Sequence, residues 1–166
     1  MPGPNATAHT YAEMGSLKEF KARFDIKKIN ERDESGDSFL LRAIYGDKTD
    51  TALYLIKKGI DLNMTDSDGN TALHYAAWRK NKVVFKALLK HGADIEITNK
   101  YGNSPIWTAI MESKGKDYDL LKMILKYHPI VDRKNKVGLS PLDMTIKIGY
   151  KEAENLLRKE LNQRSD

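Results

Sequence analysis

The sequence predicts an all-α solenoid of about five stacked helix-turn-helix units joined by β-hairpin-like loops, with degenerate units as terminal caps. The first observation is a recurring glycine. Gly36, Gly69 and Gly102 are 33 residues apart, and Gly138 follows after 36. The second observation is that similar sequence surrounds each glycine, with small and aliphatic residues at helical spacing after it. Such a repeat indicates one supersecondary unit stacked several times, because a single unit cannot bury its apolar face.

The unit at residues 66–98 carries the pattern most completely. A turn with Gly69 precedes the first predicted helix, where Leu73, Ala76 and Ala77 share one face. The second predicted helix carries an apolar stripe that we expect to be buried: Val83, Val84, Ala87 and Leu88. Gly92 follows, and it suits the left-handed conformation that commonly ends a helix.

Two units precede this one. Residues 33–65 keep the turn glycine and the aliphatic positions of both helices. Residues 5–32 form a degenerate N-terminal cap. Its second helix is expected to open at Leu17 and to carry Phe20 and Phe24.

Two units follow. Residues 99–134 and 135–161 each begin with a turn glycine and a proline. The proline fits the first helical turn, where its missing N–H costs nothing. The first of these units has three extra residues, which we place in a loop at residues 112–118, away from the hairpin tips. Whether the segment Ser113–Asp119 takes part in recognition stays open. The last unit serves as the C-terminal cap.

This pattern resembles the ankyrin repeat, which has a turn with glycine, then Thr-Pro-Leu-His and two alanines, then a second helix that ends in Gly-Ala-Asp. Residues 66–98 carry most of it, with Ala72 where proline is usual. The resemblance covers nearly the whole chain, and the last two units look like those of short bacterial ankyrin proteins. It implies a non-catalytic module that binds another protein.

Composition argues against several other classes of function. The chain has no cysteine, so neither a disulfide framework nor a thiolate metal site can form. The net charge of +5 is modest for 166 residues, and we predict no nucleic-acid binding. The sequence shows no secretory signal, and no apolar run approaches the ~20 residues of a membrane span. We expect one cytoplasmic domain over residues 1–166, without membrane contact and monomeric when free.

The sequence contains no recognisable catalytic constellation. The resemblance implies that His9 and His74, at the Leu-His position, link neighbouring hairpins, while His91 and His128 end second helices, where a cation suits the helix dipole. None of the histidines has a companion at metal-ligand spacing. A phosphate loop and a nucleophile elbow are also missing. We therefore predict no enzyme activity, no cofactor and no metal.

The resemblance also indicates where a partner would touch. In ankyrin-like stacks, partners contact the hairpin tips and the exposed positions of the first helices along the concave face. Carried over to this chain, the candidate partner-binding residues are Tyr45, Asp68, Asn70, Trp78, Arg79, Tyr101, Met111 and Glu112. We expect Trp78 to be the main anchor of a ridge with Tyr45 and Met111, because Trp, Tyr and Arg dominate interface hot spots. The alternative is that Trp78 is core. Trp107, at the family's buried histidine position, is expected to be structural.

Charge is uneven along the predicted hairpin tips. The tips of the units at 33–65 and 66–98 are acidic, whereas those of 99–134 and 135–161 are basic. A bipolar edge of this kind would orient a partner of opposite polarity. Ordinary solvated turn chemistry is the alternative explanation.

Two uses of a protein-binding surface remain open. One is a cytoplasmic immunity protein that neutralises a cognate toxin by covering its active surface. The other is a host-directed viral or symbiont effector or scaffold that mimics a cellular ankyrin inhibitor. A toxin gene next to this one would favour the first use.

Overall fold

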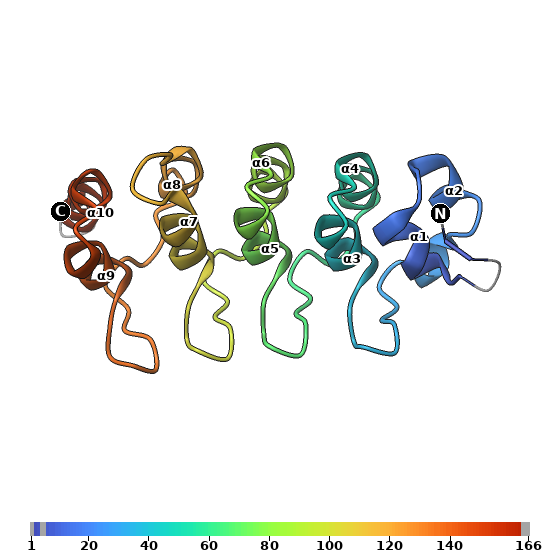
Figure 1. Cartoon of the computed structure of the whole chain (residues 1–166), viewed down its shortest axis with the longest axis horizontal. Coiled ribbons are helices and arrows are strands. Elements are labelled where there is room, and N and C mark those ends of the chain that lie inside the picture. The colour runs from blue at the N-terminus through green and yellow to red at the C-terminus, as the bar shows by residue number, and fades with distance from the viewer. Residues whose placement is uncertain (1, 4–5, 164–166) are drawn as a thin grey trace.

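The computed structural model describes residues 2–3 and 6–163. Over these residues the chain forms ten α-helices and one 3₁₀ turn. The helices stand as five pairs in a row, and four long loops project from one side of that row (Figure 1). The predicted all-α solenoid is therefore confirmed. We call the first helix of each pair inner, the second outer, and the projecting loops fingers.

The bounds of these elements are as follows. The inner helices are α1 (Ala8–Met14), α3 (Phe39–Tyr45), α5 (Ala72–Trp78), α7 (Pro105–Ser113) and α9 (Pro141–Ile148). The outer helices are α2 (Leu17–Lys21), α4 (Thr49–Lys57), α6 (Lys82–Lys90), α8 (Asp119–Leu125) and α10 (Lys151–Gln163). The 3₁₀ turn is Ile26–Lys28. Fingers 1 to 4 are the loops 29–38, 58–71, 91–104 and 126–140.

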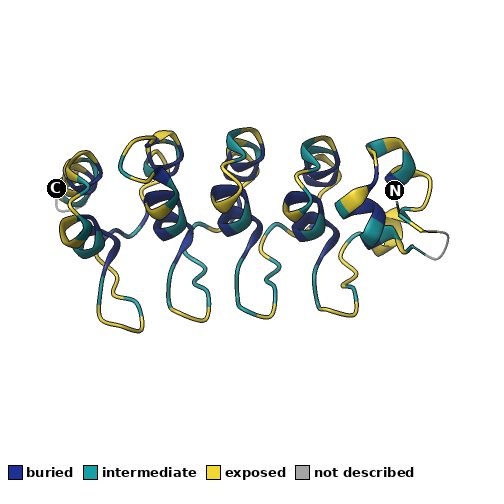
Figure 2. Cartoon of the chain, viewed as in Figure 1, coloured by how far each residue is buried: buried dark blue, intermediate teal, exposed yellow. Residues whose placement is uncertain are grey.

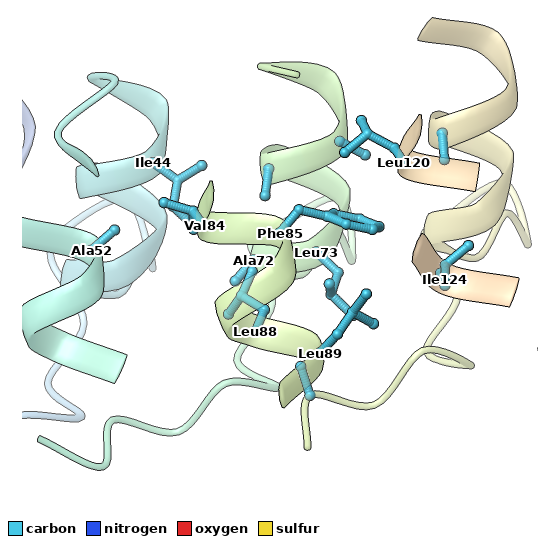
Figure 3. Close-up of a cluster of buried hydrophobic side chains, with 14 of the residues drawn as sticks. Ile44, Ala52, Ala72, Leu73, Val84, Phe85, Leu88, Leu89, Leu120 and Ile124 are labelled. Carbon is cyan, nitrogen blue, oxygen red and sulfur yellow. The ribbon is translucent and has the colours of Figure 1, made fainter. Parts of the chain in front are cut away.

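The core is one continuous apolar seam that runs through all the repeats. In α5, Leu73, Ala76 and Ala77 are buried as predicted, and the alanines let the neighbouring inner helices approach closely. Helix α6 contacts the outer helices α4 and α8 of the two neighbouring repeats, and Figure 3 shows Phe85 pointing toward the repeat that carries Leu120. Buried residues accordingly concentrate in the helix pairs, whereas the fingers consist mostly of exposed and intermediate residues (Figure 2). Each repeat thus depends on its neighbours for burial.

The predicted apolar stripe of α6 is partly wrong. Val84 and Leu88 are buried, but Val83 is 57% exposed and Phe85 is fully buried in its place. The reason is geometric: α6 packs against a repeat on each side. Its buried face therefore spans two helical rows, which begin at Val84 and Phe85, and Val83 falls on the opposite side.

The turn glycine of finger 2 illustrates why this residue recurs. Gly69 has φ +81°, a left-handed conformation that other residues adopt only with strain. A Cβ at this position would also lie 3.0 Å from the Cα of Asn99 in finger 3. Both the turn and the close approach of the next finger therefore require glycine here.

Some predicted boundaries at the ends of the stack need correction. Helix α2 ends at Lys21, so Phe24 lies beyond it. The Phe24 ring instead turns back onto Phe20, with ring centroids 4.8 Å apart. The predicted domain over 1–166 includes residues 1, 4–5 and 164–166, which lie outside the described residues. None of the helices in the described part combines the length and the apolar character needed to cross a bilayer.

Candidate functional site

The inner face, formed by the inner helices and the fingers, carries the three residues that the sequence analysis grouped as a ridge. Tyr45 and Trp78 are the last residues of α3 and α5 and are 43% and 46% exposed. Their ring centroids lie 6.1 Å apart. Met111, in α7, is 45% exposed. The alternative that Trp78 is core is therefore wrong, whereas Trp107 is 4% exposed and structural, as expected.

Tyr75 completes this surface, and the sequence reasoning missed it. Its ring centroid lies 6.3 Å from that of Tyr45 and 6.2 Å from that of Trp78, and its plane is steeply inclined to both. The three rings form what we call the aromatic cluster. They line a hollow of about 320 Å³, together with side chains of finger 2 and of α5 and α7: Asn70, His74 and Thr108. Its place in the sequence, directly after the motif histidine, did not indicate this role.

A hydrogen bond to finger 2 holds Tyr75 in place. Its O–H donates to Oδ2 of Asp66 at 2.8 Å. Burial, this hydrogen bond and the charge of Asp66 raise the pKa of Tyr75 well above its usual range. Burial alone would raise the pKa of Asp66, but hydrogen bonds from Tyr75 and Asn70 hold it below its usual range. Tyr75 therefore stays protonated and Asp66 stays ionised at neutral pH.

Arg79 flanks the aromatic cluster, as predicted. Its guanidinium carbon lies 4.6 Å from the Trp78 ring centroid and 5.0 Å from that of Tyr45. It also donates a hydrogen bond to the Tyr45 backbone carbonyl. The faces of these rings thus already attract one cation. Glu112 is part of an ion pair, with Lys80 Nζ 3.7 Å from its carboxylate.

The fingers are tied to one another, and this occupies two of the predicted contact residues. Asn70 Oδ1 accepts a hydrogen bond from Asn99 Nδ2 at 3.0 Å. Asp68 pairs with Lys100 at 2.9 Å between Nζ and Oδ1. The predicted bipolar edge is therefore partly neutralised where fingers 2 and 3 meet. Tyr101 is 58% exposed at the tip of finger 3, close to the ammonium of Lys100.

The two motif histidines link elements as the resemblance implied. His74 Nδ1 accepts from the Thr71 backbone N–H at 3.1 Å. Its Nε2–H consequently donates to the carbonyl of Asn103 in the next finger at 3.0 Å. His9 Nε2 lies 3.2 Å from the carbonyl of Glu31. These rings are structural links, and no cluster of three or more metal-ligating side chains occurs among the residues described here.

The inserted segment is shorter than predicted. Helix α7 continues to Ser113, which is buried and whose hydroxyl donates to the Ile110 carbonyl at 2.6 Å. The remaining loop lies between α7 and α8, away from the fingers, as expected (Figure 1). It is held to the preceding repeat through Lys82, whose Nζ lies 2.9 Å from Asp117 Oδ2.

Comparison with known proteins identifies the family. A family model described as ankyrin repeats in three copies matches residues 8–99, more than half of the chain. This chain belongs to the ankyrin repeat family. A relative, the ankyrin repeat domain-containing protein OPG015 of Monkeypox virus, is 28% identical over 107 residues. That alignment covers 64% of this chain but 24% of the viral protein, so the chain spans about a quarter of the relative it matches.

Family membership indicates what surfaces such as the inner face generally do. Ankyrin repeats are in general non-catalytic modules for protein–protein interaction, and their stacked units present an extended surface for a partner. The repeat pattern also continues beyond the matched residues, because α7 to α10 form two further pairs.

Proposed function

We propose that this chain is a non-catalytic protein-binding module that grips its partner with the inner face, and that the aromatic cluster is the anchor. The observation that carries the proposal is the half-exposed pair Tyr45 and Trp78, which is packed into a three-ring cluster beside Arg79. Aromatic and arginine side chains at the centre of a surface typically supply most of the binding free energy.

The remaining candidates fit the edge of such an interface. Asp68 and Tyr101 lie at the finger tips and are exposed enough to contact a partner, and Met111 and Glu112 extend the face along α7. Asn70 contributes mainly by holding fingers 2 and 3 together. In this proposal the whole chain acts as one domain, cytoplasmic and monomeric until it meets its partner.

The viral relative bears on the two uses that the sequence left open. Similarity to an ankyrin repeat protein of Monkeypox virus supports the host-directed alternative. In that alternative, the inner face binds a host protein. The immunity role would use the same surface to cover a toxin, but these comparisons lend it no support. In both uses, Trp78 must contact the partner protein.

An affinity-capture experiment with matched baits tests the proposal. The wild-type chain, Trp78→Ala and Tyr127→Ala are immobilised and exposed to lysates of the source organism and of its host. Tyr127 is a suitable control because it is 43% exposed, like Tyr45. It lies two residues after the end of the outer helix α8, at the base of finger 4, and not at a finger tip or on an inner helix. Quantitative mass spectrometry then compares the captured proteins.

We expect at least one protein to be retained by the wild type and by Tyr127→Ala but lost with Trp78→Ala. With the purified partner, Trp78→Ala should cost about 2 kcal/mol or more of binding free energy without unfolding the chain. Equal capture by all three baits, or no capture above an empty matrix, would contradict the proposal.

A further inference from the structure

The aromatic cluster bounds a hollow with an unusual combination of walls. The ring planes of Tyr45 and Trp78 are 28° apart, whereas Tyr75 is inclined to them by 74° and 78°. The hollow of about 320 Å³ lies at the small end of the ~300–1,000 Å³ typical of ligand pockets. Its size suits one inserted side chain rather than a cofactor.

A second hollow adjoins the first. It has about 300 Å³ and shares Tyr45 and Tyr75 with the first, and it is otherwise lined by residues of finger 1 and α3 that include Asp37 and Arg42. Tyr45 and Tyr75 therefore separate the first hollow, which is lined by aromatic rings, from the second, which is lined in part by the Asp37 carboxylate. An extended segment that crosses these two tyrosines would meet both hollows.

Carboxylates gather around Tyr75. Asp37, Asp66 and Asp68 each act electrostatically on its phenol, and each favours the protonated form. Burial raises the pKa of Asp37; Arg42 opposes this, and the charge of Asp66 adds to it. Among the described residues, Asp37 forms an ion pair with Arg42 alone, at 3.2 Å, and this guanidinium also contacts Asp33 and Glu13, at 2.7 and 3.1 Å. Asp68 is paired with Lys100, whereas Asp66 has no ion-pair partner among the described residues and only hydrogen bonds from neutral groups such as Tyr75. The negative charge around Tyr75 is therefore only partly compensated.

Ring faces and carboxylates together favour a cation. The quadrupole of an aromatic ring attracts ammonium and guanidinium groups, and neighbouring carboxylates strengthen that attraction. Arg79 shows that Tyr45 and Trp78 hold a guanidinium, but it does not line the hollow. Arg79 opposes a further cation by its like charge, but Tyr75, which no described cation covers, and Asp37 in the adjoining hollow favour one there.

We propose that the hollow lined by Tyr45, Tyr75 and Trp78 receives a lysine or arginine side chain from a basic, extended segment of the partner protein. This proposal rests on the proposed function and names the chemistry of the segment that the inner face recognises. Asp37, which lines the adjoining hollow, would attract a basic residue that flanks the inserted one. The chain as a whole carries a net charge of +5, so a preference for a basic segment has to come from this local surface.

That opposition between local and overall charge gives a sharp test. Three matched fluorescent peptides alternate glycine with lysine, norleucine or glutamate. They are titrated into the full chain, and anisotropy reports binding while the indole N–H signals of Trp78 and the buried Trp107 report location by NMR. General electrostatics favours the glutamate peptide, and general apolar contact favours the norleucine peptide. Only a local cation site favours lysine.

We expect the lysine peptide to bind best and to shift the Trp78 signal but not the Trp107 signal. Asp37→Asn should weaken that binding about fivefold, the effect of removing one charge near a surface, and Trp78→Ala about tenfold. The fold should tolerate Asp37→Asn because Arg42 keeps its two other carboxylates. Asp132→Asn, an exposed carboxylate of finger 4, is the matched control and should change nothing.

Several results would overturn the inference. These are tighter binding of the norleucine or glutamate peptide, failure of all three peptides to bind, or lysine binding that is insensitive to Asp37→Asn and Trp78→Ala. If a captured partner depends on Trp78 while lysine is not preferred, the proposed function stands and this inference fails. If the lysine peptide occupies the hollow but no captured protein depends on Trp78, the proposed function fails instead.

Discussion

Replacing His74 with alanine is expected to destabilise the fold through two orphaned backbone groups. The ring of His74 is 3% exposed. Its removal leaves the Thr71 N–H and the Asn103 carbonyl without their partners, at present 3.1 and 3.0 Å away. A buried polar group that loses its partner costs about 1–3 kcal/mol. Because the Asn103 carbonyl is only partly buried, we expect a loss of about 3 kcal/mol in the free energy of unfolding.

Urea denaturation followed by far-UV circular dichroism measures this loss. His91→Ala is the matched control, because the exposed His91 ring follows the end of α6 directly and, among the described residues, hydrogen-bonds to the Ala87 carbonyl of that helix alone, at 2.9 Å. Its removal should change the free energy of unfolding by less than about 0.5 kcal/mol. If His74→Ala costs no more than His91→Ala, the reasoning from inter-repeat hydrogen bonds is refuted.

The same ring makes stability depend on pH. Burial lowers the pKa of His74 below its usual 6.5, although the hydrogen bond to Asn103 opposes the shift. The folded state therefore binds fewer protons than the unfolded state near this pH. The contribution of His74 is fully present above pH 6.5 and is lost as the pH falls through the lowered value. In His74→Ala, the free energy of unfolding should therefore fall less as the pH is lowered. A smaller decrease should remain in that variant, because burial also lowers the pKa of His9.

The remaining predictions concern backbone space and exposed charge, and urea unfolding checks each of them. Gly46→Ala would place a Cβ 1.9 Å from the Glu13 carbonyl oxygen, and we expect a loss of about 2 kcal/mol or more; an unchanged midpoint would contradict this. Gly138→Ala meets no neighbour within 4 Å but has φ +78°, so the expected loss is about 1 kcal/mol from strain alone. Asp68→Asn removes the exposed ion pair with Lys100 and should change stability by less than about 0.5 kcal/mol; a larger loss would show that the pair matters for the fold.

The repeat architecture could be predicted from the sequence because its determinants are local. A turn glycine, a proline at the first helical position and alanines at helical spacing each specify conformation or packing by themselves. The exposure of Trp78 followed from its place after Ala76 and Ala77, and the burial of Trp107 from its place in the motif. These are the positions at which family pattern and helix geometry agree.

Tyr75 could not be assigned in this way. Its position next to the buried His74 gave no sign that its hydroxyl reaches Asp66 in finger 2, and that contact fixes the ring against Tyr45 and Trp78. The same limit applied to Asn70, since its bond to finger 3 depends on how successive repeats are staggered. The motif histidines were predictable links because they belong to the repeated pattern, whereas contacts of residues outside that pattern depend on how successive repeats stack.

The seam between repeats has a mechanical consequence. The helices in substantial contact belong to one repeat or to adjacent ones, so a pulling force along the long axis is transmitted in series from one contact between adjacent repeats to the next. Each contact between adjacent repeats can open or shear slightly without disturbing distant ones, so small displacements add up and the stack deforms elastically as a whole. A partner bound across α3, α5 and α7 would span two such contacts and stiffen that part of the stack.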